Sequence, residues 1–253
     1  MKAKILGIVL LLASSPVWAQ QAASKAPSAQ TDIDPLALRV LQAAVDPIQK
    51  ANSFTFRAIV GREHPATSGQ IVTLFHVSDF TVERPDKIYA DIHGQGKEVQ
   101  LFAKAGQCTL YTPEVKMYAS ISCAKTTDTA LEDLDRKEIF IPVRNFLVSD
   151  PYGSLTGALI TAYVVGQATL GDQLVTHLAF TEAEADWQLW VVGGEKPEVR
   201  RLEVIDKSKP GHPRTTVDFL NWDLQAKPSD DLFTFHKPED AMQVELLKQS
   251  SRK

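Results

Sequence analysis

Alternating apolar and polar residues run through much of the chain and predict strands. In residues 53–60, Phe54, Phe56 and Ala58 fall on one face of an extended segment. Residues 70–82 form a long run rich in β-branched side chains. Four more such segments follow at short intervals, at 87–93, 98–104, 108–112 and 116–123. Six strands in sequence with turn-like connections predict an antiparallel meander.

A helical period replaces this alternation in three places. Asp34 followed by Pro35 is typical of a helix start, and apolar residues at helical spacing follow as far as Val45. We expect Pro47 to interrupt this helix, with one more turn through Lys50. Residues 126–138 and 142–148 predict two further helices, and residues 150–153 predict a turn.

Strands then resume up to the C-terminal part of the chain. They are expected at 159–170, 173–181, 187–192, 199–206 and 215–224, with a turn-rich loop at 206–213, a last edge strand at 231–235 and a terminal helix at 239–248. No strand–helix–strand alternation occurs, which argues against a parallel sheet. The prediction is a β-rich α+β fold, in which one strongly curved antiparallel sheet of about 11 strands forms an open half-barrel. An N-terminal helix and further helices on the concave side complete this single domain, residues 34–247.

The first residues have the pattern of a secretory signal peptide. Lys2 and Lys4 precede nine mostly apolar residues at 5–13, and Val17 and Ala19 occupy the −3 and −1 positions of a cleavage site. A transmembrane anchor is the alternative, but such a span needs about 20 apolar residues. No cysteine follows the apolar run, which argues against a lipid anchor. We therefore predict cleavage after Ala19 and export to a periplasm.

The amino-acid composition predicts disorder at both ends of the mature chain and argues against nucleic acid as a partner. Residues 20–33 are too polar to bury a core and predict a disordered leader, and residues 248–253 predict a frayed tail. Without Lys2 and Lys4, 25 basic side chains face 31 acidic ones. This acidic balance argues against nucleic-acid binding, which needs many Lys and Arg on one face. No later stretch is apolar enough to span a membrane.

The two cysteines, Cys108 and Cys123, predict a disulfide, because an exported pair is expected to be oxidised. If the turn between the two strands centres on Val115 and Lys116, the cysteines oppose each other directly across a hairpin. A redox-active pair is the sharper alternative, but such pairs usually have CxxC spacing beside a helix N-terminus. Two buried free thiols are the remaining alternative.

Known catalytic motifs do not occur in the chain, and no cofactor is expected. Six scattered histidines share no helical or loop spacing, so we predict no metal site; they are His64, His76, His93, His177, His212 and His236. An acidic run predicts a solvated helix face rather than a calcium loop; its members are Asp128, Glu132, Asp133 and Asp135.

The segment DWQLW at 186–190 is apolar on both faces of a strand. Trp187, Leu189 and Val191 face one way, and Gln188, Trp190 and Val192 face the other. Such a strand is expected to be buried on both faces. Either core packing or the lining of a ligand cavity explains the two tryptophans.

Several segments together resemble a family of predicted periplasmic proteins of unknown function. They are DPLALRVLQAA at 34–44, RPDKIYADIHGQG at 84–96, LYTPEVKMYA at 110–119, HLAFTEAEADWQLWVVGG at 177–194 and FTFHKPEDA at 233–241. That family is similar in fold to the periplasmic lipoprotein carriers and their outer-membrane receptors. The resemblance implies a half-barrel with an apolar concave face, and it implies that residues 126–148 form a lid or plug.

Three classes of function follow. The first is a periplasmic carrier that holds a lipid, acyl chain or lipoprotein in the half-barrel. The size of the side chains and their positions on strands or in the lid predict the residues that line its cavity: Phe102, Leu110, Tyr118, Phe146, Phe180, Trp187 and Trp190. Arg84 is expected at the rim, facing an anionic headgroup, although a surface turn is the commoner place for Arg. The second class is an envelope module that binds or senses a protein partner, and the third is an enzyme of unknown class.

Overall fold

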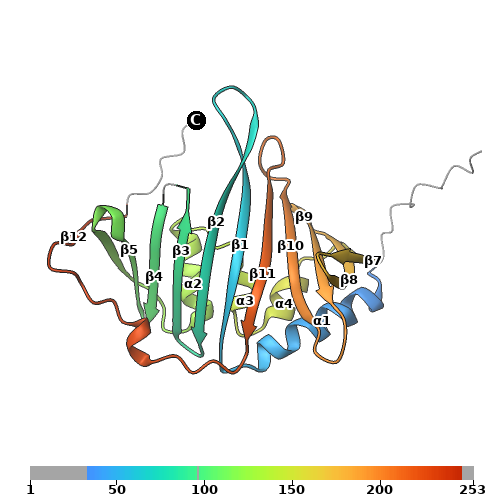
Figure 1. Ribbon diagram of the computed structural model, residues 1–253, viewed down its shortest axis with the longest axis horizontal. Coiled ribbons are helices and arrows are strands. Elements are labelled where there is room, and N and C mark those ends of the chain that lie inside the picture. Colours follow the sequence, from blue (N-terminus) through green and yellow to red (C-terminus); the bar gives the residue numbers. More distant parts are fainter. Residues whose placement is uncertain (1–32, 96, 247–253) are drawn as a thin grey trace, which may run out of the picture. The chain divides into compact units, whose positions relative to one another are not determined.

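The computed structural model describes residues 33–95 and 97–246. The predicted signal peptide, nearly all of the predicted leader and the predicted tail lie outside these residues. Within the described part, the strands form one sheet of twelve strands in the order β12-β6-β5-β4-β3-β2-β1-β11-β10-β9-β8-β7 (Figure 1). The strands are β1 (Ser53–Pro65), β2 (Ile71–Glu83), β3 (Lys87–Gly94), β4 (Lys97–Lys104), β5 (Gln107–Thr112), β6 (Met117–Ser122), β7 (Thr161–Leu170), β8 (Gln173–Thr181), β9 (Ala185–Val192), β10 (Glu198–Asp206), β11 (Arg214–Asp223) and β12 (Met242–Gln243).

The sheet consists of two meanders joined side by side. Strands β1 to β6 pair in chain order, and so do β7 to β11. Antiparallel pairing of β1 with β11, from Thr55 opposite Asp223 to Arg62 opposite Thr215, joins the two. Every pair is antiparallel except the short β12–β6 pair. The predicted open, curved, mainly antiparallel sheet with an N-terminal helix is confirmed.

Four helices lie on the concave face of the sheet, called the inner face below (Figure 1). They are α1 (Pro35–Lys50), α2 (Thr127–Arg136), α3 (Arg144–Leu147) and α4 (Pro151–Thr156). As predicted, Asp34 is the N-cap of α1, and its carboxylate accepts a hydrogen bond from the Leu36 N–H. The predicted break at Pro47 is wrong, because the helix continues to Lys50. Ile48 is buried in that last turn, and its packing offsets the backbone hydrogen bond that proline cannot make.

Three predictions in the loops and the C-terminal segment are also wrong. Residues 150–153 begin helix α4 rather than a turn, with the Asp150 carboxylate accepting from the Gly153 N–H. The predicted edge strand at 231–235 is a 3-10 helix, η2 (Asp230–Phe233), because Phe233 packs onto the sheet instead of pairing at its edge. The predicted helix at 239–248 is absent as far as residue 246. The backbone there pairs with the edge of β6 instead, as β12.

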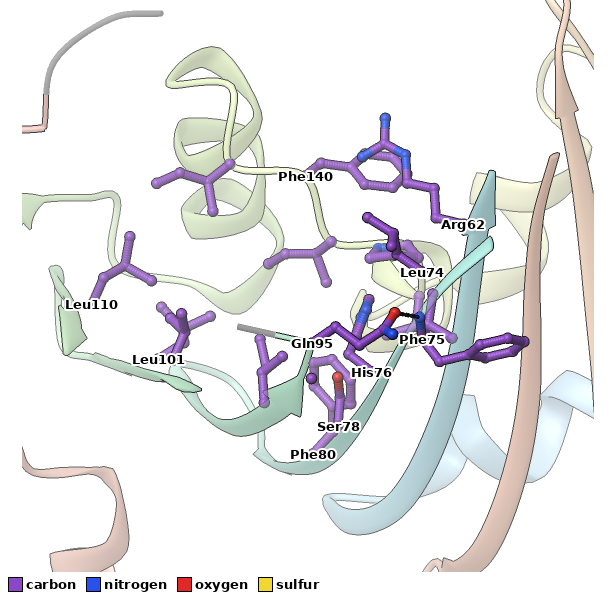
Figure 2. A pocket seen from close by; sticks show the side chains of 18 of the residues that line it. Arg62, Leu74, Phe75, His76, Ser78, Phe80, Gln95, Leu101, Leu110 and Phe140 are labelled. Carbon is purple, nitrogen blue, oxygen red and sulfur yellow. Dashed lines mark hydrogen bonds between the residues drawn. The ribbon is translucent and has the colours of Figure 1, made fainter. Parts of the chain in front are cut away.

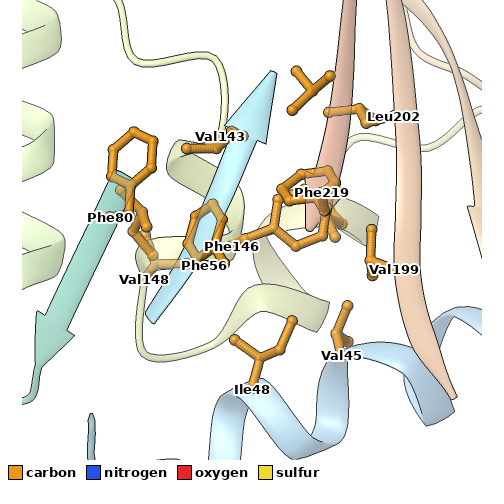
Figure 3. Close-up of a cluster of buried hydrophobic side chains, with 14 of the residues drawn as sticks. Val45, Ile48, Phe56, Phe80, Val143, Phe146, Val148, Val199, Leu202 and Phe219 are labelled. Carbon is orange, nitrogen blue, oxygen red and sulfur yellow. The ribbon is translucent and has the colours of Figure 1, made fainter. Parts of the chain in front are cut away.

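The core lies between the inner face and the helices. Where β1, β11 and α3 meet, Phe219 packs between Phe56 and Phe146, with ring centroids 5.7 and 4.9 Å away (Figure 3). All three rings are at most 2% exposed. On β9, Trp187 and its inward neighbours are buried, as the alternation predicts. The other face of β9 is only half-buried, so the expected burial on both faces is wrong.

The predicted disulfide joins Cys108 and Cys123, whose Cα atoms are 5.9 Å apart. The predicted register is wrong by two residues, because Cys108 opposes Ile121 rather than Cys123. The 3-10 turn η1 (Pro113–Val115), which ends with Lys116 in the left-handed region, centres the hairpin earlier in the chain. The bond is therefore diagonal. Cys123 reaches it just beyond the end of β6, where its N–H donates to the Gly106 carbonyl.

Candidate functional site

A cavity of about 400 Å³ lies between the inner face of the first meander and the segment that connects α2 to α3 (Figure 2). Its lining comprises Val60, Arg62, His64, Leu74, Phe75, His76, Ser78, Phe80, Ile92, Gly94, Gln95, Val99, Leu101, Leu110, Ile139, Phe140, Ile141, Pro142 and Val143. Most of these side chains are apolar. Because alternate residues of each strand point inward, strands β1 to β5 form the wall of the cavity.

The segment over the cavity, residues 137–143, is called the lid segment below. It is irregular, so no helix fills the space between it and the sheet. The segment turns away from α2 at Glu138, which has a positive φ of 61°. Ile141 and Val143 point inward and are buried, whereas the Phe140 ring is 58% exposed. The lid segment therefore covers the cavity only in part.

Three of the four carboxylates in the acidic run hold the lid segment and its flanking helices in place. Asp128 accepts hydrogen bonds from the Ser149 N–H and hydroxyl beyond α3, and Asp135 pairs with Arg144 at 2.8 Å. Asp133 accepts from the Ala124 N–H and from Arg136, which together lower its pKa. Burial raises the pKa of Asp135. The prediction of a solvated face fits only Glu132.

Basic side chains gather at one end of the cavity, on the inner face of β1 and β2. Arg62, His64 and His76 all line it. The Arg62 guanidinium lies 4.8 Å from the centre of the Phe140 ring, so it reaches across to the lid segment (Figure 2). Burial lowers the pKa of His76, and the nearby charge of Arg62 lowers it further. His76 is therefore a neutral imidazole near pH 7.

Close backbone approach fixes the position of His76. It pairs with Gly94 of β3, and a Cβ atom built on Gly94 would lie 2.5 Å from the His76 Cβ and 3.0 Å from the Phe75 carbonyl oxygen. Any larger residue at Gly94 displaces β2 or β3 at this point.

Only Leu110 of the seven expected cavity residues lines the cavity. Phe146 is fully buried in the core beneath β11. Phe180 and Trp187 stack on each other at 3.8 Å in the core of the second meander. Trp190 faces the outer side of the sheet, where it stacks on His177.

Phe102 and Tyr118 also lie on the outer face, because they alternate with inward-facing neighbours on their strands. There they pack around Phe235, with ring centroids 5.5 and 5.1 Å away. The C-terminal residues 230–236 cross the outer face at this place. Lys87 and Lys104 anchor them through Asp230 and lower the pKa of that carboxyl to about 2.

Arg84 does not lie at the rim of the cavity. Its guanidinium donates to the carbonyl oxygens of Ile48, Ala51 and Val148 at 2.6–3.0 Å, and it sits 5.0 Å from the centre of the Phe54 ring. Burial lowers the pKa of Arg84, and Asp128 partly counters that effect. The side chain thus ties the end of α1 to the residue after α3, and its donors are not directed at a ligand.

The basic end of the cavity was not predicted from the sequence, although the sequence contains a signal for it. The alternation that places Phe54, Phe56 and Ala58 inward continues through Val60 to Arg62 and then to His64. Extending the predicted strand beyond residue 60 would have placed both basic residues on the inner face.

Among the described residues, no three His, Cys, Asp or Glu side chains are grouped so that they could hold a metal ion. In the same part of the chain, no helix has the length and apolarity needed to cross a bilayer.

Fold and cavity together define a class of protein, the open antiparallel half-barrel with a mainly apolar pocket between its sheet and the lid segment. Residues 37–247 match the family model described as "Predicted periplasmic protein (DUF2092)". The chain belongs to this family.

Several solved structures are similar to the chain at low sequence identity. An uncharacterized conserved protein from Thermus thermophilus matches with 9% identity and a TM-score of 0.48, covering 83% of this chain and 99% of that one. LprF from Mycobacterium bovis matches with 13% identity, the same coverages and a TM-score of 0.48. A LolA superfamily protein from Nitrosomonas europaea matches with 12% identity and a TM-score of 0.34, covering 79% and 97%. No curated protein sequence matches the chain.

Proposed function

We propose that this protein is a periplasmic binding or carrier protein that holds an apolar ligand, such as a lipid, an acyl chain or the acyl part of a lipoprotein, in the cavity under the lid segment. We further propose that it is exported by the signal peptide at residues 1–19, with cleavage after Ala19. The observation that carries the proposal is the cavity itself. Its volume of about 400 Å³ falls within the range of roughly 300–1,000 Å³ that is usual for small-molecule sites.

A comparison of the two meanders supports a binding role. In the second meander, α1 covers the inner face, and side chains such as Val45, Leu178 and Leu189 are fully buried in the hydrophobic core. In the first meander, the irregular lid segment replaces a helix and leaves a void over Ile92, Leu101 and Leu110. Protein interiors are normally packed without voids of this size. A void of this size over the inner face of the first meander is therefore more consistent with a ligand site than with a core.

The chemistry of the wall selects the ligand class. Apolar side chains such as Val60, Phe80 and Val99 form most of the lining, so transfer of an alkyl chain from water is favourable by about 0.8 kcal/mol per buried CH₂ group. The partly exposed lid segment lies over the cavity. A ligand can therefore enter beside Phe140 without unfolding of the sheet.

The first experiment is to purify the protein from its native compartment and analyse an organic extract by mass spectrometry, beside an unrelated periplasmic protein. A stoichiometric acyl species that is absent from the control supports the proposal and identifies the ligand. A clean extract counts against a tightly held lipid.

A matched pair of variants tests whether the ligand binds in this cavity. Val99→Phe adds an aromatic ring inside the cavity, whereas Val165→Phe makes the same change at a half-exposed position of β7. We expect Val99→Phe to lower the affinity for N-phenyl-1-naphthylamine, followed by fluorescence, at least tenfold, with little change for Val165→Phe. Equal affinities of both variants and the unmodified protein would place the probe elsewhere.

One observation favours the second candidate function, an envelope protein that binds a protein partner. Leu74 of β2 and Phe140 of the lid segment are 41% and 58% exposed, and both line the cavity. Exposed apolar side chains that lie together mark interaction surfaces. If the extract is clean and Val99→Phe has no effect, this pair is the next site to test.

A further inference from the structure

The basic end of the cavity contains no acidic counterpart. The side chains that line the cavity include Arg62, His64 and His76 but no Asp or Glu. Among the described residues, no carboxylate lies within ion-pair distance of any of these three groups. Over the full chain, by contrast, 31 acidic side chains outnumber 27 Lys and Arg. The cavity is therefore locally basic, whereas the chain as a whole carries more acidic than basic side chains.

This arrangement differs from that of other arginines in the sheet. Arg57 lies on the same strand as Arg62 but on the outer face, where it forms a bidentate pair with Asp79 at 2.7 and 2.8 Å. Arg201 pairs in the same way with Asp218. Arg62 contacts the Phe140 ring instead. A contact with an aromatic ring uses no N–H donor, so the guanidinium keeps its donors for a ligand.

The Arg62 guanidinium lies next to the apolar wall of the cavity, because basic and apolar side chains follow each other on the inner face of β1 and of β2. On β1, Val60 comes two residues before Arg62 on the same face, and on β2, Ser78 and Phe80 follow His76 inward. A molecule with a charged head at Arg62 would thus place its tail over Phe80 and toward Leu101 (Figure 2). A wall that is basic at one end and apolar along the rest matches an amphiphile rather than a wholly apolar compound.

We infer that the cavity binds an anionic single-chain amphiphile, with its alkyl tail against the apolar wall and its oxyanion headgroup held by Arg62. His64 and His76 supply further hydrogen bonds to the headgroup. This inference rests on the proposed function and names its ligand class. Guanidinium recognises carboxylate and phosphate in the same bidentate way, so the shared chemistry is an oxyanion on an alkyl chain.

The lowered pKa of His76 is consistent with this assignment. A neutral imidazole is tolerated in the half-buried wall, and it donates through one nitrogen. The permanent positive charge at the site is therefore that of Arg62, which makes this residue the one to change.

The test uses four ligands with the same twelve-carbon chain, namely dodecanoate, dodecyl phosphate, dodecanol and dodecylamine. Binding to the delipidated full chain is measured by isothermal titration calorimetry below the micelle concentration. We expect dodecanoate or dodecyl phosphate to bind at least tenfold more tightly than dodecanol, and dodecylamine to bind most weakly. Whichever anion binds better distinguishes a carboxylate from a phosphate headgroup.

Arg62→Gln should lower the affinity for the anions at least tenfold and lower the affinity for dodecanol much less, so that the preference for the anion is lost. Arg57→Gln is the matched control, with the same substitution on the same strand but the opposite face, and it should keep the preference. Equal binding of all four ligands would overturn the inference while leaving a cavity for apolar ligands intact. If none of the four binds, the inference and the proposed function both fail.

Discussion

Removal of the disulfide between Cys108 and Cys123 should destabilise the protein by a predictable amount. The bond closes a loop with a sequence separation of 15 residues. In the chain-entropy relation, a closed loop of about 15 residues restricts the unfolded state by about 3 kcal/mol at 25 °C. Cys108 is buried on the inner face, so alanine at both positions avoids the cost of burying a hydroxyl there. We expect Cys108→Ala/Cys123→Ala to unfold with a free energy lower by about 3 kcal/mol.

The assay is urea unfolding of the oxidised protein and of the double alanine variant, followed by tryptophan fluorescence. Reduction with dithiothreitol supplies an internal control. The reductant should lower the stability of the unmodified protein to nearly that of the variant, and it should leave the variant unaffected.

A loss below about 1 kcal/mol, with an unchanged urea dependence, would refute the reasoning. It would mean that the β5–β6 hairpin stays closed in the unfolded chain without the bond, so that the bond restricts nothing. A variant that keeps its stability but has a steeper urea dependence would indicate instead that the bond compacts the unfolded state.

Three further predictions concern other parts of the structure. Arg84→Met leaves three buried carbonyl oxygens without their charged donor and should lower the free energy of unfolding by about 3 kcal/mol, measured with urea. Because the pKa of Asp230 is lowered from 3.8 to about 2, its pairing with Lys104 stabilises the folded state above pH 4 and is lost as the pH falls toward 2. Hydrogen exchange of residues 230–236, corrected for intrinsic rates, should therefore rise between pH 5 and pH 2, and Asp230→Asn should show the fast exchange at both values. Gly94→Ala should clash with His76 and lower the thermal midpoint by several degrees, and an unchanged midpoint would show that β2 and β3 can separate there without cost.

The strands were predictable because alternation reports directly which side chains point inward. It placed Phe54 and Phe56 correctly, and it placed Trp187 and Leu189 on one buried face. The presence of two cysteines in a chain with a predicted signal peptide was also enough to predict that they form a disulfide. Their register was not predictable, because it depends on the conformation of a single turn residue, Lys116.

Alternation does not report what covers an inward-facing side chain. Phe146 and Leu110 are both apolar and both point into the half-barrel, but the first is packed against Phe219 and the second faces a void. The difference depends on the path of the lid segment, which ion pairs and caps between distant residues determine. A short pattern such as FTF at 233–235 is equally ambiguous, since it suits either an edge strand or a segment lying across a sheet.

The pairing of β1 with β11 has a consequence for how the protein folds. Its partners, such as Arg62 and Thr215, lie more than 150 positions apart along the chain, whereas the other antiparallel pairs join neighbouring strands. Local pairs form quickly and distant ones slowly, so we expect each meander to assemble before the two meet. The strand walls of the cavity, β1 to β5, belong entirely to the first meander. An early intermediate would therefore expose this apolar surface before α1 and the second meander are in place, and this is the stage at which the chain most needs protection from aggregation.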